Sequence, residues 1–390
     1  MIIMKIFKNK KCKAFILLFI LYSPYLFGSI KSFLIAYIWK YEYEKIENYL
    51  KICSSPGIFI SSKIKTSNNP KVSIISPVYN TGNFIMRFLK SIQNQNFNDI
   101  EIILIDDCSK DNSVELIKRC QNEDKRIRLI KNKKNKGTFA SRIIGIQQSV
   151  GIYIMIPDSD DILLENSLKY FYNFSIKYNY ELLRFNIYLT YGKTFFSNIV
   201  DKLESRPINQ PELSTYIFYG LGYLKQIDFN LSNKFIKREA LIRALNIFTK
   251  NDLNLYMTCH EDGLLNYLLY RTAKSSFFLK KFGYYYIKNN YKKRGGYFQF
   301  KNIKFSFIHI IYVFLYSKNS KYEKDMTNEI FKRLIIKKRI KDRLSLINKE
   351  YNFFIDIITI LNENEFFLNK YKKYLNYMKN AFLKKIIKNI

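Results

Sequence analysis

The chain has 390 residues, 48% of them hydrophobic, so it can form the core of one large domain or two ordinary ones. Its 65 Lys and Arg residues outnumber 32 acidic residues and give a formal net charge of +33. The basic residues are spread along the chain, which indicates a solvated basic surface, and we predict no nucleic-acid partner. The five cysteines form no CxxC pair, which argues against a zinc ribbon, and their odd number argues against a complete disulfide framework.

The N-terminus has the pattern of a membrane anchor. Five lysines between residues 5 and 13 precede an apolar run, Ala14–Ile30, and a second apolar stretch ends at Trp39. A bilayer span needs roughly 17–25 residues, so the first run is short for a span, and snorkelling of Lys31 to the interface could extend it. We predict a cytoplasmic tail and signal-anchor helix over residues 1–40, with single-pass type II topology. The rest of the chain would then be lumenal (ER or Golgi) or extracytoplasmic, although a cleaved signal peptide is the competing interpretation.

Residues 41–69 are polar and end in a run rich in Ser and Asn, which is typical of a stem or linker. Short apolar runs and helical patterns alternate after residue 70, and this alternation predicts a parallel α/β sheet covered on both faces. The predicted strands are Lys71–Pro77, Ile100–Ile105, Ile127–Ile130 and Ile152–Ile156, and the predicted helices are Asn83–Gln95, Ser113–Cys120 and Phe139–Ser149.

Beyond residue 161 the pattern is weaker. A helix is expected to start near Ile162, with Asp161 as its cap. Later elements are a strand at Leu182–Leu189, helices at Lys234–Leu245 and Gly263–Tyr270, and a strand pair or a strand and turn at Phe277–Ile287. Residues 301–390 are predicted to form a helical C-terminal region that packs on the preceding domain, with a place on the membrane surface as the alternative.

Polar side chains follow the predicted parallel strands, where open α/β sheets bind their ligands. The candidates are Pro77, Val78, Tyr79 and Asn80 after the first strand, Asp106 and Asp107 after the second, Gly137 and Arg142 past the third, and Asp158, Ser159, Asp160 and Asp161 after the fourth. Because these ends are neighbours in a parallel sheet, the sequence predicts one crevice that contains an aromatic ring, several carboxylates and an arginine.

This set of side chains suits a nucleotide-sugar. Tyr79 can stack on the base, and Asp106 can accept a hydrogen bond from a base N–H. Asp158 and Asp160 can hold a hard divalent cation, Mn²⁺ or Mg²⁺, which would offset charge on a diphosphate. Arg142 can reach a phosphate or the base. Asp107 is a candidate ligand too, but its competing role is to accept hydrogen bonds from turn N–H groups.

Four sequence runs together resemble the nucleotide-binding half of family 2 glycosyltransferases: KVSIISPVYN, ILIDDCSKDNS, NKGTFASR and IMIPDSDD. The resemblance covers about residues 70–165. It implies a GT-A fold, that is, a Rossmann-like mixed α/β sheet flanked by helices of the nucleotide-diphospho-sugar transferase type. On this basis residues 70–300 form the catalytic domain, with nucleotide-sugar binding in 70–165 and the acceptor half in 166–300. Cys108 departs from the glycine that the family often has there.

The acceptor half resembles the family more loosely. The run SNKFIKRE at residues 232–239 is similar to a helix start in these enzymes, and Tyr284–Tyr286 is similar to their aromatic strand. Glu261 and Asp262 resemble the family's ED motif, which implies that Asp262 is the general base and that Glu261 contacts the nucleotide-sugar. A place at a helix N-terminus would favour the ionised form of Asp262.

The resemblance implies an inverting, metal-assisted glycosyltransferase that uses a nucleotide-diphospho-sugar, with UDP as the expected nucleotide. The acceptor would be a hydroxyl of a saccharide, a lipid or a protein. Two alternatives stay open at this point. One is a dolichyl-phosphate-type enzyme that uses GDP-mannose, and the other is a non-catalytic membrane protein that binds nucleotide-sugars or glycans.

Overall fold

The computed structural model describes residues 48–49, 51–53, 69–191, 194–198, 206–210, 213, 230–248, 253, 257 and 261–288. The chain divides into two compact units, Met1–Ile58 and Phe59–Ile390. In the first unit the described residues are helical. The predicted anchor (1–40), most of the predicted stem and the predicted C-terminal region (301–390) lie outside the described residues. None of the helices in the described ranges is long and apolar enough to cross a membrane.

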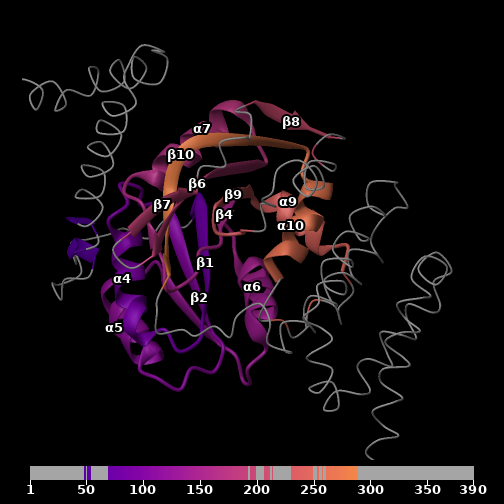
Figure 1. The fold of residues 1–390 in the computed structure, drawn as a ribbon. Coiled ribbons are helices and arrows are strands. Elements are labelled where there is room, and N and C mark those ends of the chain that lie inside the picture. The colour runs from indigo at the N-terminus through magenta and orange to yellow at the C-terminus, as the bar shows by residue number, and fades with distance from the viewer. Residues whose placement is uncertain are drawn as a thin grey trace, which may run out of the picture. The chain divides into compact units, whose positions relative to one another are not determined.

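Residues 70–165 contain the predicted alternation of strands and helices (Figure 1). Four parallel strands lie in the order β3-β2-β1-β4. Their bounds are β1 Val72–Val78, β2 Ile100–Asp106, β3 Ile127–Lys131 and β4 Tyr153–Met155, and the helices between them are α4 Gly82–Gln93, α5 Ser113–Glu123 and α6 Gly137–Gln148. The predicted parallel sheet is therefore confirmed, and its strand ends are neighbours as expected.

Helices cover both faces of the sheet, which explains why its central strands are apolar on both sides. Ile75, Ile103 and Ile105 pack against α6 in one core cluster. Ile74 and Ile102, which point the other way, pack in a second cluster that includes α4 and α5. Figure 1 shows these two helical layers on opposite sides of β1 and β2.

The second half extends the sheet with antiparallel and parallel neighbours, so the whole sheet is mixed. The order continues from β4 through β9 (Lys234–Lys237), β6 (Leu182–Tyr191) and β10 (Ser275–Lys288) to β5 (Ile162–Leu163), with β7 (Thr194–Asn198) on β6 and β8 (Pro207–Asn209) on β10. Strand β10 runs parallel to β6, whereas β9 is antiparallel to both β4 and β6.

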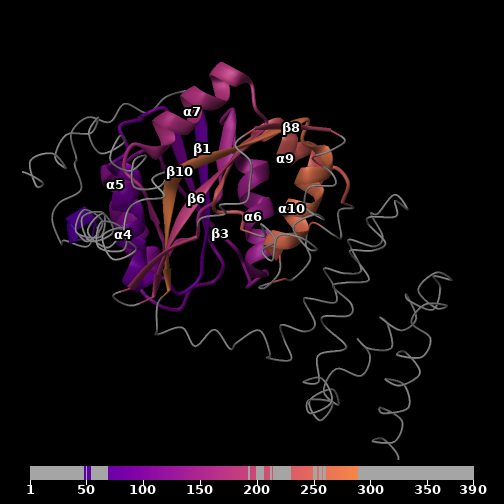
Figure 2. The same cartoon turned by 45° about the horizontal axis from the view of Figure 1, so that its top comes forward.

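Three further helices complete the layers (Figure 2). Helix α7 (Ser167–Tyr178) packs in the cluster that contains α4. Helices α9 (Arg238–Leu245) and α10 (Glu261–Thr272) pack in the cluster that contains α6. The N-terminus of α10 thus belongs to the same layer as α6, whose N-terminus follows the end of β3.

Three of the predicted elements are wrong in detail. The predicted helix Lys234–Leu245 begins as strand β9, because its first residues pair with both β4 and β6 before α9 starts. The predicted strand pair Phe277–Ile287 is one strand, β10, whose register shifts account for its irregular pattern. Asp161 caps no helix, because Ile162 and Leu163 form β5 and α7 begins only at Ser167.

Candidate active site

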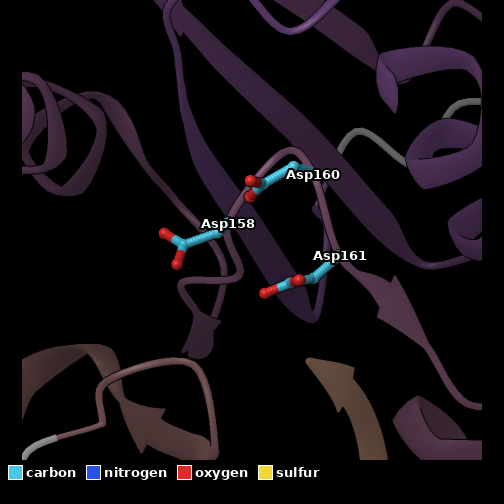
Figure 3. Close-up of side chains that lie close together, drawn as sticks. All are labelled: Asp158, Asp160 and Asp161. Carbon is cyan, nitrogen blue, oxygen red and sulfur yellow. The ribbon is translucent and has the colours of Figure 1, made fainter. Parts of the chain in front are cut away.

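A short loop between β4 and β5 carries three aspartates. One carboxylate oxygen each from Asp158, Asp160 and Asp161 lies within 4.8 Å of the others. Figure 3 shows the three aspartate side chains on this loop. Because carboxylate oxygens are the ligands that hard divalent cations prefer, the cluster fits Mg²⁺ or Mn²⁺. The predicted pair, Asp158 and Asp160, is therefore in a suitable place.

Neighbouring elements fix the backbone of this aspartate loop. The Arg87 Nη2 group of α4 donates a hydrogen bond to the carbonyl oxygen of Asp160 at 2.8 Å. The Ser159 hydroxyl donates to the carbonyl oxygen of Pro77 at 2.9 Å, which joins the loop to the end of β1. The predicted candidates Ser159 and Pro77 thus bond to each other and shape the frame of the site.

Asp161 differs from its two neighbours because each of its carboxylate oxygens accepts a hydrogen bond from β10. Its Oδ2 accepts from the Tyr284 hydroxyl at 2.6 Å, and its Oδ1 accepts from the Ile287 N–H at 2.8 Å. Burial, together with the charges of Asp160 and Asp158, raises the pKa of Asp161. Burial beside Asp161 also raises the pKa of Tyr284, so its hydroxyl keeps the proton that it donates.

Arg142 connects the aspartate loop to the start of α10. Its Nη2 donates to Asp158 Oδ1 at 2.8 Å, and its Nη1 donates to Glu261 Oε1 at 3.0 Å and to Asp262 Oδ1. The Arg142 side chain is only 3% exposed. Sequence reasoning placed Arg142 against a phosphate or base, whereas the structure shows its guanidinium bonded to three carboxylates. Residues 142, 158, 261 and 262 therefore form one site, although they come from distant parts of the chain.

Burial is the largest influence on the pKa values of Glu261 and Asp262, the acidic pair at the start of α10. It raises the pKa of Asp262, although the Arg142 charge opposes this and the Asp158 charge adds to it. Burial likewise raises the pKa of Glu261 against the effect of Arg142. The net shift of the Asp262 pKa is therefore opposite to the shift that a helix N-terminus alone would give. A raised pKa brings a carboxylate nearer the range that suits a general base.

Asp106 and Asp107 end β2 and shape the loops around it. Asp106 Oδ1 accepts from the Ser109 N–H at 3.1 Å. Asp107 Oδ1 accepts from the Lys136 N–H at 2.7 Å, and its Oδ2 accepts from the Gly137 N–H at 2.8 Å. Both oxygens of Asp107 hold the start of α6, so the structure supports the backbone-capping role over the ligand role.

Two residues near these loops adopt the left-handed backbone conformation, Cys108 with φ 65° and Gly137 with φ 84°. A Cβ on Gly137 would come 2.7 Å from the carbonyl oxygen of Met257, so a side chain there would push two segments apart. The non-glycine residue Cys108 is strained by roughly 1–2 kcal/mol in this conformation. Glycine, which the family resemblance implies at this position, would adopt this conformation without that cost.

The end of β1 leaves one aromatic ring accessible. Tyr79 is 46% exposed. Its neighbour Asn80 has φ 53° and accepts from the Lys110 N–H through Oδ1 at 2.8 Å. The Val78 carbonyl accepts from the Asp107 N–H at 2.9 Å. Val78 and Asn80 therefore join the end of β1 to the loop that follows β2. Tyr79, between them, presents a ring on which a base can stack.

Sequence reasoning missed that Tyr284 and Arg87 form hydrogen bonds to the aspartate loop. Tyr284 stands in a run of three tyrosines, in a chain with 32 of them, so only its place in the aromatic strand set it apart. Arg87 lies inside a helix among many other basic residues and belongs to no motif. Their contacts to the aspartate loop join distant parts of the chain, so no local sequence pattern predicts them.

The sequence profile of the family described as "Glycosyl transferase family 2" matches residues 73–244. An "Uncharacterized glycosyltransferase" of Haemophilus influenzae is 32% identical over 265 residues, which cover 66% of this chain and 100% of that protein. Glycosyltransferase GlyG of Streptococcus pneumoniae is 38% identical over 101 residues, 26% of this chain and 34% of GlyG, so the match spans about a third of that relative. The chain therefore belongs to glycosyltransferase family 2 and is a glycosyltransferase.

Solved structures agree with the fold. The crystal structure of residues 1–349 of S. aureus TarS in complex with UDP-GlcNAc superposes with a TM-score of 0.56 at 18% identity, over 80% of this chain and 88% of TarS 1–349. The same TarS fragment in complex with UDP also has a TM-score of 0.56. These similarities support a GT-A-like mixed α/β sheet with flanking helices.

Proposed function

We propose that this glycosyltransferase transfers a sugar from a UDP-sugar to a hydroxyl group, with inversion at the anomeric carbon and with help from a divalent cation. The acceptor hydroxyl would belong to a saccharide, a lipid or a protein. The choice of UDP rests on the TarS fragment, which was crystallised with UDP and with UDP-GlcNAc. The exposed Tyr79 ring at the end of β1 offers a surface for stacking the base.

One observation carries this proposal: the guanidinium of Arg142 bonds both to a proposed cation ligand and to the proposed general base. Arg142 bonds to Asp158 of the aspartate loop and to Asp262 at the start of α10. The diphosphate of a donor bound at the loop would therefore lie in the same site as Asp262. Glycosyl transfer needs this arrangement, because the group that takes the acceptor's proton must face the carbon that loses the nucleotide.

The aspartate loop fits a divalent cation. Asp158 and Asp160 are the residues that would hold Mn²⁺ or Mg²⁺, since the oxygens of Asp161 already bond to β10. Such a cation, when bound, would stabilise negative charge on the departing nucleoside diphosphate.

Asp262 is the residue that we assign as general base. Burial beside Asp158 raises its pKa, and Arg142 holds its carboxylate at one oxygen. As the acceptor oxygen attacks the anomeric carbon and the bond to the diphosphate breaks, the hydroxyl proton passes to the Asp262 carboxylate. Attack from the face opposite the nucleotide inverts the configuration. Glu261 shares Arg142 with Asp262 and helps to fix the guanidinium.

A screen of nucleotide-sugar hydrolysis with the full-length chain tests this proposal. UDP-GlcNAc, UDP-galactose, UDP-glucose and GDP-mannose would each be incubated with and without Mn²⁺, and the released nucleotide measured. We expect release from at least one UDP-sugar and its loss when EDTA removes the metal. Release from GDP-mannose alone would contradict the UDP assignment. Binding of a donor without turnover, with or without added acceptor sugars, would instead support a non-catalytic binding protein.

A further inference from the structure

Strand β10, which pairs with β5, contacts the preceding aspartate loop through the side chain of Tyr284. The Tyr284 hydroxyl donates to Asp161 Oδ2 at 2.6 Å and accepts from the Asp158 backbone N–H at 3.0 Å. Tyr284 lies 123 residues from Asp161 in the sequence and is fully buried. A single hydroxyl therefore bonds to the first and the last aspartate of the loop.

A second contact from the same strand reinforces this link. The Ile287 N–H donates to Asp161 Oδ1 at 2.8 Å, so both oxygens of Asp161 accept from β10. Next to Asp161, β10 also pairs with β5, where Tyr284 lies opposite Leu163. The end of the loop is thus fixed at its side chain by Tyr284 and in its backbone by strand pairing. Asp161 acts as the point of attachment, and Asp158 and Asp160 keep the role of cation ligands.

Cation affinity depends on how well the protein holds its ligands before the ion arrives. Residues that orient metal ligands without touching the metal typically change affinity by about 10–100-fold when mutated. Asp158 and Asp160 are separated by one residue in this loop. Their carboxylates need such support, because an unsupported turn samples many side-chain positions. Among the described residues, Tyr284 is placed to give that support, since its hydroxyl bonds to Asp158 at one end of the loop and to Asp161 at the other.

We propose that Tyr284 is a positioning residue for the divalent cation, which acts by holding the Asp158–Asp161 loop in the geometry that binds metal. This inference rests on the proposed metal-assisted function. It differs from a purely structural role in one measurable respect: loss of the hydroxyl should weaken metal binding itself, not only the stability of the fold.

The test removes the hydroxyl and keeps the ring, as Tyr284→Phe. The matched control is Tyr153→Phe, because Tyr153 is also buried but its hydroxyl bonds to the Tyr180 carbonyl, outside the loop. Free Mn²⁺ would be followed by electron paramagnetic resonance during titration of each full-length protein in the presence of UDP. We expect at least about 10-fold weaker Mn²⁺ binding for Tyr284→Phe and wild-type binding for Tyr153→Phe.

Turnover gives a second readout from the same proteins. The Mn²⁺ concentration for half-maximal donor hydrolysis should rise in Tyr284→Phe by the same factor as the dissociation constant, and the rate at saturating Mn²⁺ should fall much less. Should Tyr284→Phe fail to fold, as judged by thermal unfolding, Asp161→Ala removes the acceptor of the same hydrogen bond and takes its place in both assays.

Two results would overturn the role of Tyr284 while leaving the proposed function intact. One is Mn²⁺ binding by Tyr284→Phe as tight as that of the wild type, and the other is an equal loss in Tyr284→Phe and Tyr153→Phe. If the wild-type protein itself bound no Mn²⁺ with UDP and hydrolysed donors equally well in EDTA, the metal-assisted function would fail together with this inference.

Discussion

Replacement of Arg142 by lysine should give a folded protein whose transfer rate is lower by at least on the order of 100-fold. The guanidinium spans Asp158 on one side and the acidic pair of α10 on the other. An ammonium group is a point charge on a flexible stem, so it can neutralise one carboxylate but cannot bridge both sides. The aspartate loop and Asp262, the proposed base, would then no longer be held at a fixed distance and orientation. The measurement is kcat for transfer or donor hydrolysis, with thermal unfolding measured on the same sample.

Arg126→Lys is the matched control for this variant. Arg126 is another buried arginine, and it bonds to Asp124 through Nε at 2.9 Å and Nη2 at 2.8 Å. It precedes β3, at the edge of the parallel sheet opposite the strand ends that form the site. Both variants disturb buried ionic contacts of an arginine, so both should be destabilised. Only Arg142→Lys should lose turnover. Equal turnover in the two variants would show that Arg142 does no more than stabilise the fold.

Replacement of Asp262 by asparagine should lower the rate of sugar transfer by about 10²–10⁴-fold, the range typical of a lost general base. The amide has the shape of the carboxylate but cannot take the proton of the acceptor hydroxyl. Binding of the donor should change by only a few-fold, because Asp158 and Asp160 are untouched. The transfer rate at saturating acceptor tests the first expectation, and calorimetric titration with UDP and Mn²⁺ tests the second.

Glu181→Gln is a suitable control for Asp262→Asn. Glu181 is a buried carboxylate that is paired with Arg243 and lies outside the site. Its amide variant should keep the wild-type transfer rate within a few-fold. A near-normal rate in Asp262→Asn would instead assign the base to another carboxylate, with Glu261 as the first to examine, since it shares the same guanidinium.

The fold of residues 70–165 was predictable because each strand and helix there has its own sequence pattern. A parallel strand covered on both faces must be apolar throughout, and β1 and β2 are buried along nearly their whole length. Both ends of β1 and the C-terminal end of β2 differ from their predicted positions by one residue. The polar residues at the strand ends converge because the strand order β3-β2-β1-β4 makes those ends neighbours.

The fold beyond residue 165 was less predictable because pairing with distant strands decides its structure. Lys234–Lys237 has a helical pattern, yet it forms a strand because β4 and β6 lie on either side of it. The same is true of the site. A motif places Arg142 and Asp161 near the ligand, but only the fold shows that Arg142 bridges three carboxylates and that Asp161 bonds to β10. Likewise, desolvation of Asp262 depends on its packing, which a helix N-terminus does not reveal.

The central claim is that Asp158 and Asp160 hold a cation against the diphosphate of a UDP-sugar in the site that Asp262 shares. Its most direct test is UDP-sugar hydrolysis by Asp160→Ala over a range of Mn²⁺ concentrations, beside the wild type. We predict that Mn²⁺ stimulates the wild type and that the variant, although folded, shows no stimulation at any concentration. The same Mn²⁺-stimulated rate in both proteins would contradict the claim.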